Sequence, residues 1–272
     1  MKAISLVFEY DFNRQLESGR TWGKEGYRSR DFIFEYSAAS FITFADKNKN
    51  FNHEIFTDNP ELLWKNLNRY DVDLSNIKVI DGSDKIREWK NHRYCFYPAM
   101  MHLDMYKDEK DQLIKLDNDL VCLENIEFLY DSSEYLLWQV ERDLVSKGRE
   151  YWGEREASRQ AFGTDVFPLW NIGVLGFPKG DKKDLIEEMI NAGIKCSEVD
   201  ISSVCRFPEA PGLTSKIWSC AEQTGYSFVI HDRGLKVRTT KDIIDHHCHG
   251  FDSKKECILS ASHLLKKEFR KG

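Results

Sequence analysis

Gln112-Leu113-Ile114-Lys115-Leu116-Asp117-Asn118-Asp119 is a mostly apolar run that ends at two carboxylates. The run predicts a buried strand, because short apolar segments bounded by turn residues are typical of strands inside a sheet. Carboxylates at such a strand end do little for a folded core. They suit a divalent cation, since Mg²⁺ and Mn²⁺ prefer oxygen ligands and commonly bridge carboxylates to substrate phosphates. The alternative is a solvated turn, in which Asp and Asn are common.

The composition is that of an ordinary globular protein. The chain has 272 residues, of which 41% are hydrophobic and 31% charged. Its formal net charge of −6 does not favour nucleic acid as a partner. The seven cysteines are odd in number and include no Cys-x-x-Cys pair, so a reducing compartment fits better than a disulfide framework. No apolar run approaches the ~20 residues that span a bilayer. We therefore expect a cytoplasmic protein.

Strand-like and helix-like segments alternate along the first half of the chain. The expected strands are residues 2–10, 53–57, 77–80 and 112–116. The expected helices are residues 30–45, 60–67 (with Asn59 as cap) and 93–107. Repeated units of this kind predict an α/β fold with a Rossmann-type, mostly parallel sheet flanked by helices.

The second half of the chain is less regular. It predicts helices at 144–162, 184–192 and 214–225, strands at 170–177 and 226–231, an extended segment at 243–249, and a basic amphipathic segment at 253–271. In open α/β sheets, ligands bind at the carboxyl ends of the strands. Asp58, Asp117 and Asp119 all follow such ends, so we expect them near one crevice.

A second cluster of polar residues is Asp245-His246-His247-Cys248-His249. In an extended segment the side chains alternate between two faces, which groups Asp245, His247 and His249 apart from His246 and Cys248. Either group could bind zinc, although the spacing fits no common structural zinc module. The other interpretations are histidines that belong to the core, or one histidine that joins Asp119 at a shared catalytic cation.

Several nucleotide-binding and calcium-binding motifs are excluded by their spacing. The segment Gly19-Arg20-Thr21-Trp22-Gly23-Lys24-Glu25 lacks one residue of a P-loop and its final Ser/Thr. No Gly-x-Gly-x-x-Gly follows the first strand. Cys122 occupies the position at which an EF-hand needs Gly.

Asp117-Asn118-Asp119 resembles the DxD motif of GT-A-fold glycosyltransferases, which use nucleotide-sugar donors. Three later segments resemble further motifs of these enzymes in the same order: the strand Asn171-Ile172-Gly173-Val174, the pair Glu222-Gln223, and the tail from His247 through Gly250 to Lys254. The closest pattern is that of the galactosyltransferase-like glycosyltransferase family eight. The tail has one residue more between Gly250 and Lys254 than that family's pattern, which leaves the choice between His247 and His249 open.

The resemblance implies a role for each matched residue. Asp117 and Asp119, with His247 or alternatively His249, would bind Mn²⁺ or Mg²⁺. The donor-binding residues would be Asp58, Arg93, Asn118, Asn171, Gly173 and Lys254. The catalytic or acceptor-side residues would be Asp165, Glu222 and Gln223.

The resemblance also implies a function and an organisation. The function is metal-dependent transfer of a sugar from a nucleotide-sugar donor, with UDP-sugar favoured, to a glycan or lipid-linked acceptor. The alternatives are a sugar nucleotidyltransferase and a non-catalytic sugar- or cation-binding protein. We expect a single domain of residues 1–272, with a nucleotide-binding half (about 1–120), a sugar and acceptor half (about 121–252) and a basic C-terminal helix (253–272). That helix either contacts an anionic membrane peripherally or docks on the protein in the ordinary way.

Overall fold

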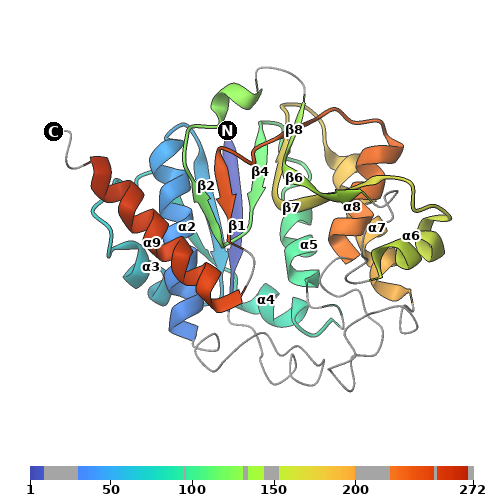
Figure 1. Cartoon of the computed structure of the whole chain (residues 1–272). Helices are drawn as coiled ribbons and strands as arrows, with labels where there is room; N and C mark the ends of the chain where they lie inside the picture. The colour runs from blue at the N-terminus through green and yellow to red at the C-terminus, as the bar shows by residue number, and fades with distance from the viewer. Residues whose placement is uncertain are drawn as a thin grey trace.

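A seven-stranded sheet runs through both halves of the sequence (Figure 1). The computed structural model describes residues 1–8, 30–92, 94, 96–130, 134–143, 153–199, 221–247 and 250–268. The strand order is β3-β2-β1-β4-β7-β6-β8. The strands are β1 (Lys2–Val7), β2 (Asn52–Thr57), β3 (Ile77–Asp81), β4 (Leu113–Leu116), β6 (Tyr135–Asp143), β7 (Pro168–Phe177) and β8 (Val237–Thr239).

The predicted fold class is confirmed, because all strands but one of this sheet share one direction. β1 pairs in parallel with β2 and β4, β2 with β3, and β6 with β8. β7 is the exception, since it pairs antiparallel with both β4 and β6. The reversal lets β7 enter the sheet beside β4 and lays residues 171–173 next to the carboxylates that follow β4.

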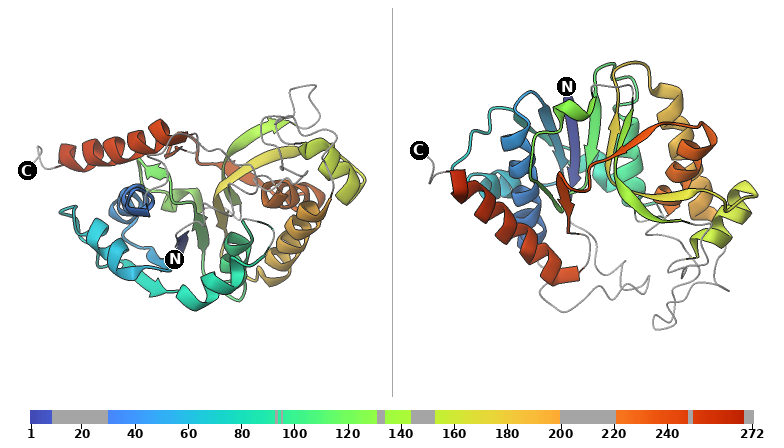
Figure 2. Two further views of the ribbon diagram at one scale, coloured as in Figure 1. Left: turned by 90° about the horizontal axis from the view of Figure 1, so that it is seen from below. Right: turned by 45° about the horizontal axis from the view of Figure 1, so that its top comes forward.

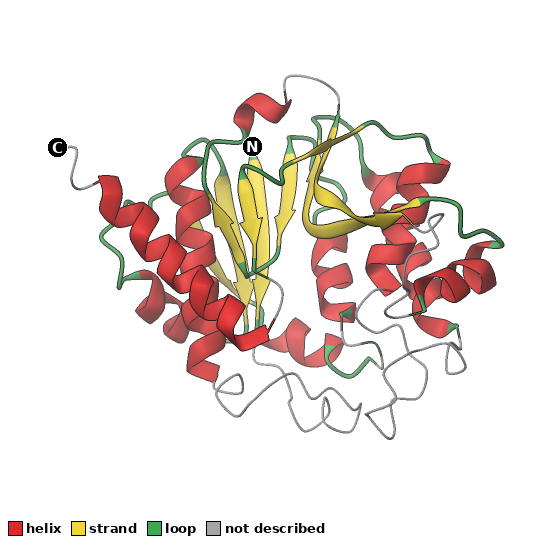
Figure 3. Cartoon of the chain, viewed as in Figure 1, coloured by secondary structure: helices red, strands yellow, loops and turns green. Residues whose placement is uncertain are grey.

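Helices cover both faces of the sheet (Figures 2 and 3). On one face, α2 (Arg30–Lys47), α3 (Pro60–Leu67) and α9 (Gly250–Glu268) pack around Val7, Ile55 and Ile77. On the other, α5 (Tyr97–Asp104), α7 (Lys183–Glu198) and α8 (Ala221–Asp232) pack around Ile4 and Leu113. Along β1, Ala3 and Val7 thus turn to one side and Ile4 to the other, as the two-residue period of a strand requires. The other helices of the described residues are α4 (Ser83–Trp89) and α6 (Glu154–Phe162), with a 3-10 turn at Glu127–Tyr130.

Most elements of the first half begin and end close to their predicted positions. At α3 the side chain of Asn59 accepts a hydrogen bond of 3.0 Å from the backbone N–H of Leu62, and Pro60 occupies the first turn. The predicted helix at 93–107 is shorter in the structure, where α5 begins at Tyr97; Arg93 lies outside the described residues.

One predicted strand is wrong. Residues 226–231 are rich in aromatic and β-branched side chains, which favoured a strand, but they form the second half of α8. Nearly every α8 side chain from Ala221 to Ile230 is buried, because the helix is enclosed by α7 and β7. A helix buried all round shows no amphipathic period, so burial overrode local propensity here.

A second, two-stranded sheet matters most for the site. β5 (Leu120–Cys122) pairs antiparallel with β9 (Ile244–His246), with Leu120 opposite His246. The pairing joins the segment that follows Asp119 to a segment more than a hundred residues later. It confirms that part of the predicted stretch 243–249 is extended.

α9 docks with its apolar face on the protein. Cys257, Ala261 and Leu265 are buried at helical spacing against α2, while Leu259 is 58% exposed on the opposite side. Among the described residues, no helix combines the length and apolar character needed to cross a bilayer.

Candidate active site

Two carboxylates stand where β4 ends and β5 begins. The backbone N–H of Asp117 donates a hydrogen bond of 2.8 Å to the carbonyl of Gly173 on β7, which fixes the chain at the point where it leaves the sheet. The Asp117 side chain is 37% exposed, whereas that of Asp119 is 10% exposed. The pair therefore forms one open and one enclosed ligand position at the carboxyl end of β4, as predicted for a ligand site.

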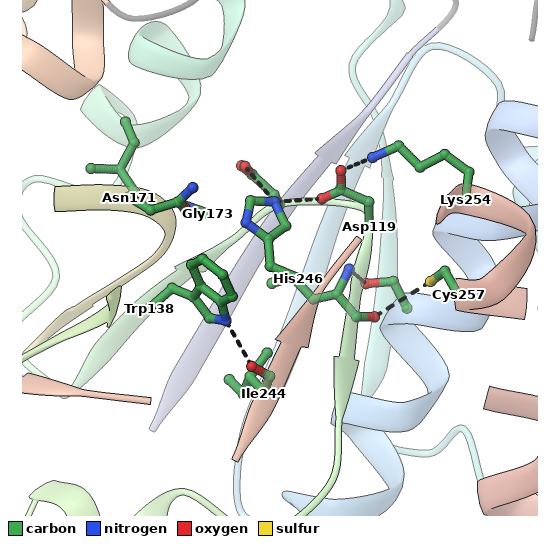
Figure 4. Close-up of polar contacts among 12 residues, drawn as sticks. Asp119, Trp138, Asn171, Gly173, Ile244, His246, Lys254 and Cys257 are labelled. Atoms are coloured by element: carbon green, nitrogen blue, oxygen red, sulfur yellow. Dashed lines mark hydrogen bonds and ion pairs between the residues drawn. The ribbon is translucent and has the colours of Figure 1, made fainter. Parts of the chain in front are cut away.

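The imidazole beside these carboxylates belongs to His246 (Figure 4). Its Nε2 lies 3.1 Å from Oδ1 of Asp119 and 3.9 Å from Oδ2 of Asp117. His247, the predicted third ligand, instead donates its backbone N–H to the carbonyl of Asp119 at 2.9 Å. His249, the alternative, lies outside the described residues. His246, and not the predicted His247, is therefore the histidine whose ring lies beside the carboxylates.

In an extended segment His246 and His247 lie on opposite faces, but the sequence does not show which face turns toward the carboxylates. The β5–β9 register decides it, because Leu120 pairs with His246 and places that ring over Asp119. Trp138 lies on the other side of the ring, edge-on at 5.2 Å between centroids, and its indole Nε1 donates to the carbonyl of Ile244 at 2.8 Å. His246 is thus held by packing on one side and faces the carboxylates with the other.

Lys254 approaches Asp119 from helix α9. Its ammonium forms an ion pair with Oδ2 of Asp119 and lies 5.3 Å from the centre of the Tyr36 ring. The side chain is only 4% exposed. Burial lowers the pKa of Lys254 to about 7, against the opposing influence of the Asp117 carboxylate. Lys254, predicted as a donor contact, is therefore placed at the site and paired with a carboxylate there.

Lys115 is the residue that the sequence reasoning missed. It lies on β4, and its Nζ donates to Oδ1 of Asp117 at 2.5 Å and to the carbonyl of Ile172 at 3.2 Å. Burial alone would lower the pKa of Lys115, but Asp117 and Glu222 raise it above its ordinary value. Burial alone would raise the pKa of Asp117, and Lys115 above all lowers it below its ordinary value. A charged residue inside the apolar run was the available signal, since buried lysines are rare unless paired.

Asn171 and Gly173 were predicted as donor-binding residues, and Glu222 and Gln223 as catalytic or acceptor-side residues. Asn171 is buried, and its Oδ1 accepts a hydrogen bond of 2.8 Å from the N–H of Gly173. Glu222 and Gln223 are buried at the start of α8, and the N–H of Glu222 donates to the Tyr94 hydroxyl at 3.2 Å. The charge of Glu222 raises the pKa of Lys115, whose ammonium contacts Asp117.

Other predicted residues lie elsewhere or remain unassigned. Asp165 accepts hydrogen bonds from Arg155 at 3.0 Å and Arg159 at 2.8 Å on helix α6, an arrangement that ties a loop to a helix and does not suit a general base. Asp58 follows β2 as predicted and pairs with Lys90 at 2.8 Å. Asn118 lies between the two aspartates in the sequence, and it is half-buried.

The donor set fits a divalent cation. Asp117, Asp119 and His246 each offer one ligand atom, and these three atoms lie within 4.8 Å of one another. Two carboxylate oxygens and an imidazole nitrogen are suitable ligands for Mn²⁺, and carboxylates also suit Mg²⁺. No other cluster of this kind occurs among the described residues.

Comparison with known proteins supports the fold. No protein-family model and no curated protein matches the chain. Two crystal structures of the galactosyltransferase LgtC are similar: a complex with donor and acceptor sugar analogs, with a TM-score of 0.48, and an active-site mutant, with a TM-score of 0.52. Each is 12% identical in sequence, and each match covers 98% of this chain and 96% of LgtC. The similarity to the second structure shows that this chain has the GT-A-type fold that its motifs predicted.

Proposed function

We propose that this chain is a cation-dependent glycosyltransferase that moves a sugar from a nucleotide-sugar donor to an acceptor. One observation carries the proposal: Asp117, Asp119 and His246 converge at the carboxyl end of β4 in a GT-A-type fold. Fold alone does not define chemistry. The convergence of three cation ligands at the ligand-binding edge of the sheet supplies the chemical argument.

In this proposal Asp117, Asp119 and His246 hold Mn²⁺ or Mg²⁺. The bound cation supplies Lewis-acid stabilisation of the charge that grows on the leaving nucleoside diphosphate. The protein's part is to fix the ligands: β4 and Gly173 hold Asp117, and the β5–β9 pairing holds Asp119 and His246. Asn118 and Asp58, which follow β4 and β2 on either side of β1, are proposed donor contacts, as is Arg93.

The sugar would lie on the β7 side of this centre. The Asn171 amide oxygen already accepts from Gly173, so its NH₂ group is oriented to donate to a sugar hydroxyl. Gly173 is a proposed donor contact through its backbone, since the His246 ring fills the space that a side chain would take. Glu222 and Gln223 are the proposed acceptor-side groups; an inverting reaction would use Glu222 as general base. Asp165 no longer belongs to the proposed machinery, since two arginines hold it.

UDP-sugar is the favoured donor from the motif resemblance, and the acceptor is proposed to be a glycan or a lipid-linked saccharide. Contact with a membrane would have to use the exposed face of α9, which carries Lys255 and Leu259, because the opposite face is docked on α2. If that contact exists, Leu259→Asp should reduce sedimentation with anionic liposomes. Equal sedimentation of wild type and variant would count against it.

The central test is the loss of catalysis without loss of fold. Asp119→Ala should abolish Mn²⁺-dependent hydrolysis or transfer of a nucleotide sugar, and EDTA should do the same to the wild type. Asp245→Asn is the matched control, since Asp245 is exposed on the next position of β9 and points away from His246. Full activity of Asp119→Ala, or of the wild type in EDTA, would exclude the proposal.

Two other functions are compatible with an acidic cation site. A sugar nucleotidyltransferase would release pyrophosphate from a nucleoside triphosphate, and a non-catalytic protein would bind donor without turnover. A thermal-shift screen of nucleotide sugars and nucleoside triphosphates, with and without Mn²⁺, shows which class of ligand binds, and an assay for released nucleoside diphosphate separates turnover from binding alone. Ligand at about 100-fold over its Kd stabilises the folded state by roughly 2.7 kcal/mol, which is readily measured.

A further inference from the structure

The two carboxylates of the proposed cation site are each paired with a buried lysine. Lys115, 10% exposed in its side chain, binds Asp117 from β4, and Lys254, 4% exposed, binds Asp119 from α9. The two lysines come from elements on opposite sides of the carboxylates, so neither can replace the other. Each carboxylate therefore faces a buried lysine nitrogen, and Lys115 is the lysine whose pKa its acidic neighbours raise.

This pairing changes what the site can bind. A divalent cation is attracted to uncompensated carboxylate charge, and ammonium groups a few ångströms away repel it. Buried charges of this kind are weakly screened by salt. A cation that arrives alone thus meets carboxylates whose negative charge the lysines already offset. A cation that arrives with a diphosphate brings further negative charge, with which the lysines can pair.

Lys115 is the better placed of the two to exert this control. It belongs to the central strand β4 and is fixed by a second hydrogen bond to the carbonyl of Ile172. It occupies one oxygen of Asp117, Oδ1, and leaves Oδ2 on the side of His246. Two partners, the Asp117 carboxylate and the Ile172 carbonyl, therefore hold its ammonium at the site.

We propose that Lys115 is a positioning residue that makes the site select a cation together with a diphosphate over a cation alone. This inference rests on the proposed function and adds to it the order of assembly: cation and diphosphate each raise the affinity of the other. Thermodynamic linkage requires the two enhancements to be equal. Lys115 sets their size by cancelling the charge of Asp117.

The test measures Mn²⁺ affinity directly, by the loss of the free Mn²⁺ signal in electron paramagnetic resonance, with no ligand, with uridine and with UDP. For the wild type we expect weak binding of Mn²⁺ alone, no change with uridine and clear strengthening with UDP. In Lys115→Met, Mn²⁺ alone should bind about tenfold tighter or more, because a nearby positive charge is gone, and the strengthening by UDP should shrink by a similar factor.

The matched controls separate charge from structure. Lys115→Arg keeps the charge and should behave as the wild type. Lys182→Met removes another buried lysine, which binds the carbonyls of Glu109, Asp111 and Gly180 at the opposite end of β4, and should leave Mn²⁺ affinity unchanged. If Lys115→Met unfolds, as thermal unfolding will show, Lys115→Gln removes the charge and keeps a hydrogen-bond donor.

The sign of the effect decides the outcome. If Mn²⁺ affinity in Lys115→Met and Lys115→Gln is unchanged or weaker, Lys115 merely anchors Asp117 and the inference is overturned, while the proposed cation site stands. If the wild type binds no Mn²⁺ even with UDP, the cation site of the proposed function fails, and this inference fails with it.

Discussion

A β-carbon at position 173 would lie 2.7 Å from Cε1 of His246 and 3.0 Å from its Nδ1. The first value is below the separation of any ordinary carbon contact, so the ring of His246 occupies space that only glycine leaves open. Gly173 of β7 and His246 of β9 are more than seventy residues apart in sequence, and their fit joins the large sheet to the small one.

Gly173→Ala should therefore displace the His246 ring and weaken Mn²⁺ binding on the order of tenfold, the usual effect of disturbing the support of a metal ligand. The measurement is Mn²⁺ affinity in the presence of UDP. Gly176→Ala on the same strand is the control, because its β-carbon would meet Tyr130 and Leu136 at 2.6 and 2.8 Å, away from the carboxylates. Both variants should lose stability, but only Gly173→Ala should lose Mn²⁺ affinity. Equal Mn²⁺ affinities would show that the ring tolerates the methyl group.

Two substitutions test whether His246 or His247 is the histidine that binds the cation. His246→Ala removes the imidazole that lies 3.1 Å from Asp119 and should weaken Mn²⁺ binding on the order of tenfold or more. His247→Ala keeps the backbone hydrogen bond to the Asp119 carbonyl and should change Mn²⁺ affinity by no more than about twofold. The reverse order of effects would restore His247 as the ligand.

The packing of α7 on α8 depends on a second glycine. A β-carbon on Gly225 would lie 2.4 Å from the backbone N of Gly193 and 2.5 Å from the carbonyl carbon of Ala192. Backbone atoms cannot move aside as a flexible side chain can, so Gly225→Ala should cost more than the 1–3 kcal/mol typical of overpacking, measured by denaturant unfolding. Gly193→Ala is the comparison, since its nearest neighbour is the flexible end of Met100 at 3.1 Å. A larger loss for Gly193→Ala would contradict this account.

The sequence predicted the carboxylate pair and the fold class because both depend on local order. Strand-like and helix-like segments alternate in the first half of the chain, and one of the strands ends at Asp117 and Asp119. This local order alone places the two carboxylates at the carboxyl edge of a parallel sheet. The third ligand could not be predicted in the same way. Which of His246 and His247 faces inward depends on the register of β9 against β5, and a shift of one residue exchanges the two faces.

Three other differences between the prediction and the structure have physical causes of the same kind. Residues 226–231 have strand-forming side chains, but enclosure by α7 and β7 makes them part of a helix. Lys115 looked like an interruption in an apolar run, and only the fold shows that Asp117 and the Ile172 carbonyl meet its ammonium. Asp165 was plausible as an acid until α6 brought two arginines to it.

A buried histidine makes the stability of the fold sensitive to acid. The ring of His53 on β2 is fully enclosed and shares a hydrogen bond of 2.9 Å with Ser5 Oγ on β1. Burial lowers the pKa of His53 from 6.5 to about 3. Between these two values the unfolded chain binds a proton that the folded chain does not. Stability therefore rises with pH across this window and is lost as pH falls below about 6.5.

His53→Gln should reduce the slope of unfolding free energy against pH, measured by denaturant titrations between about pH 5 and 6, by up to about 1.4 kcal/mol per pH unit. That range lies above the ordinary pKa values of carboxylates, which limits their contribution. The control is His263→Gln, because the His263 side chain is exposed on α9. The slope should then match that of the wild type. An unchanged slope in His53→Gln would mean that the folded chain admits the proton, and that the ring between β1 and β2 is not sealed from water.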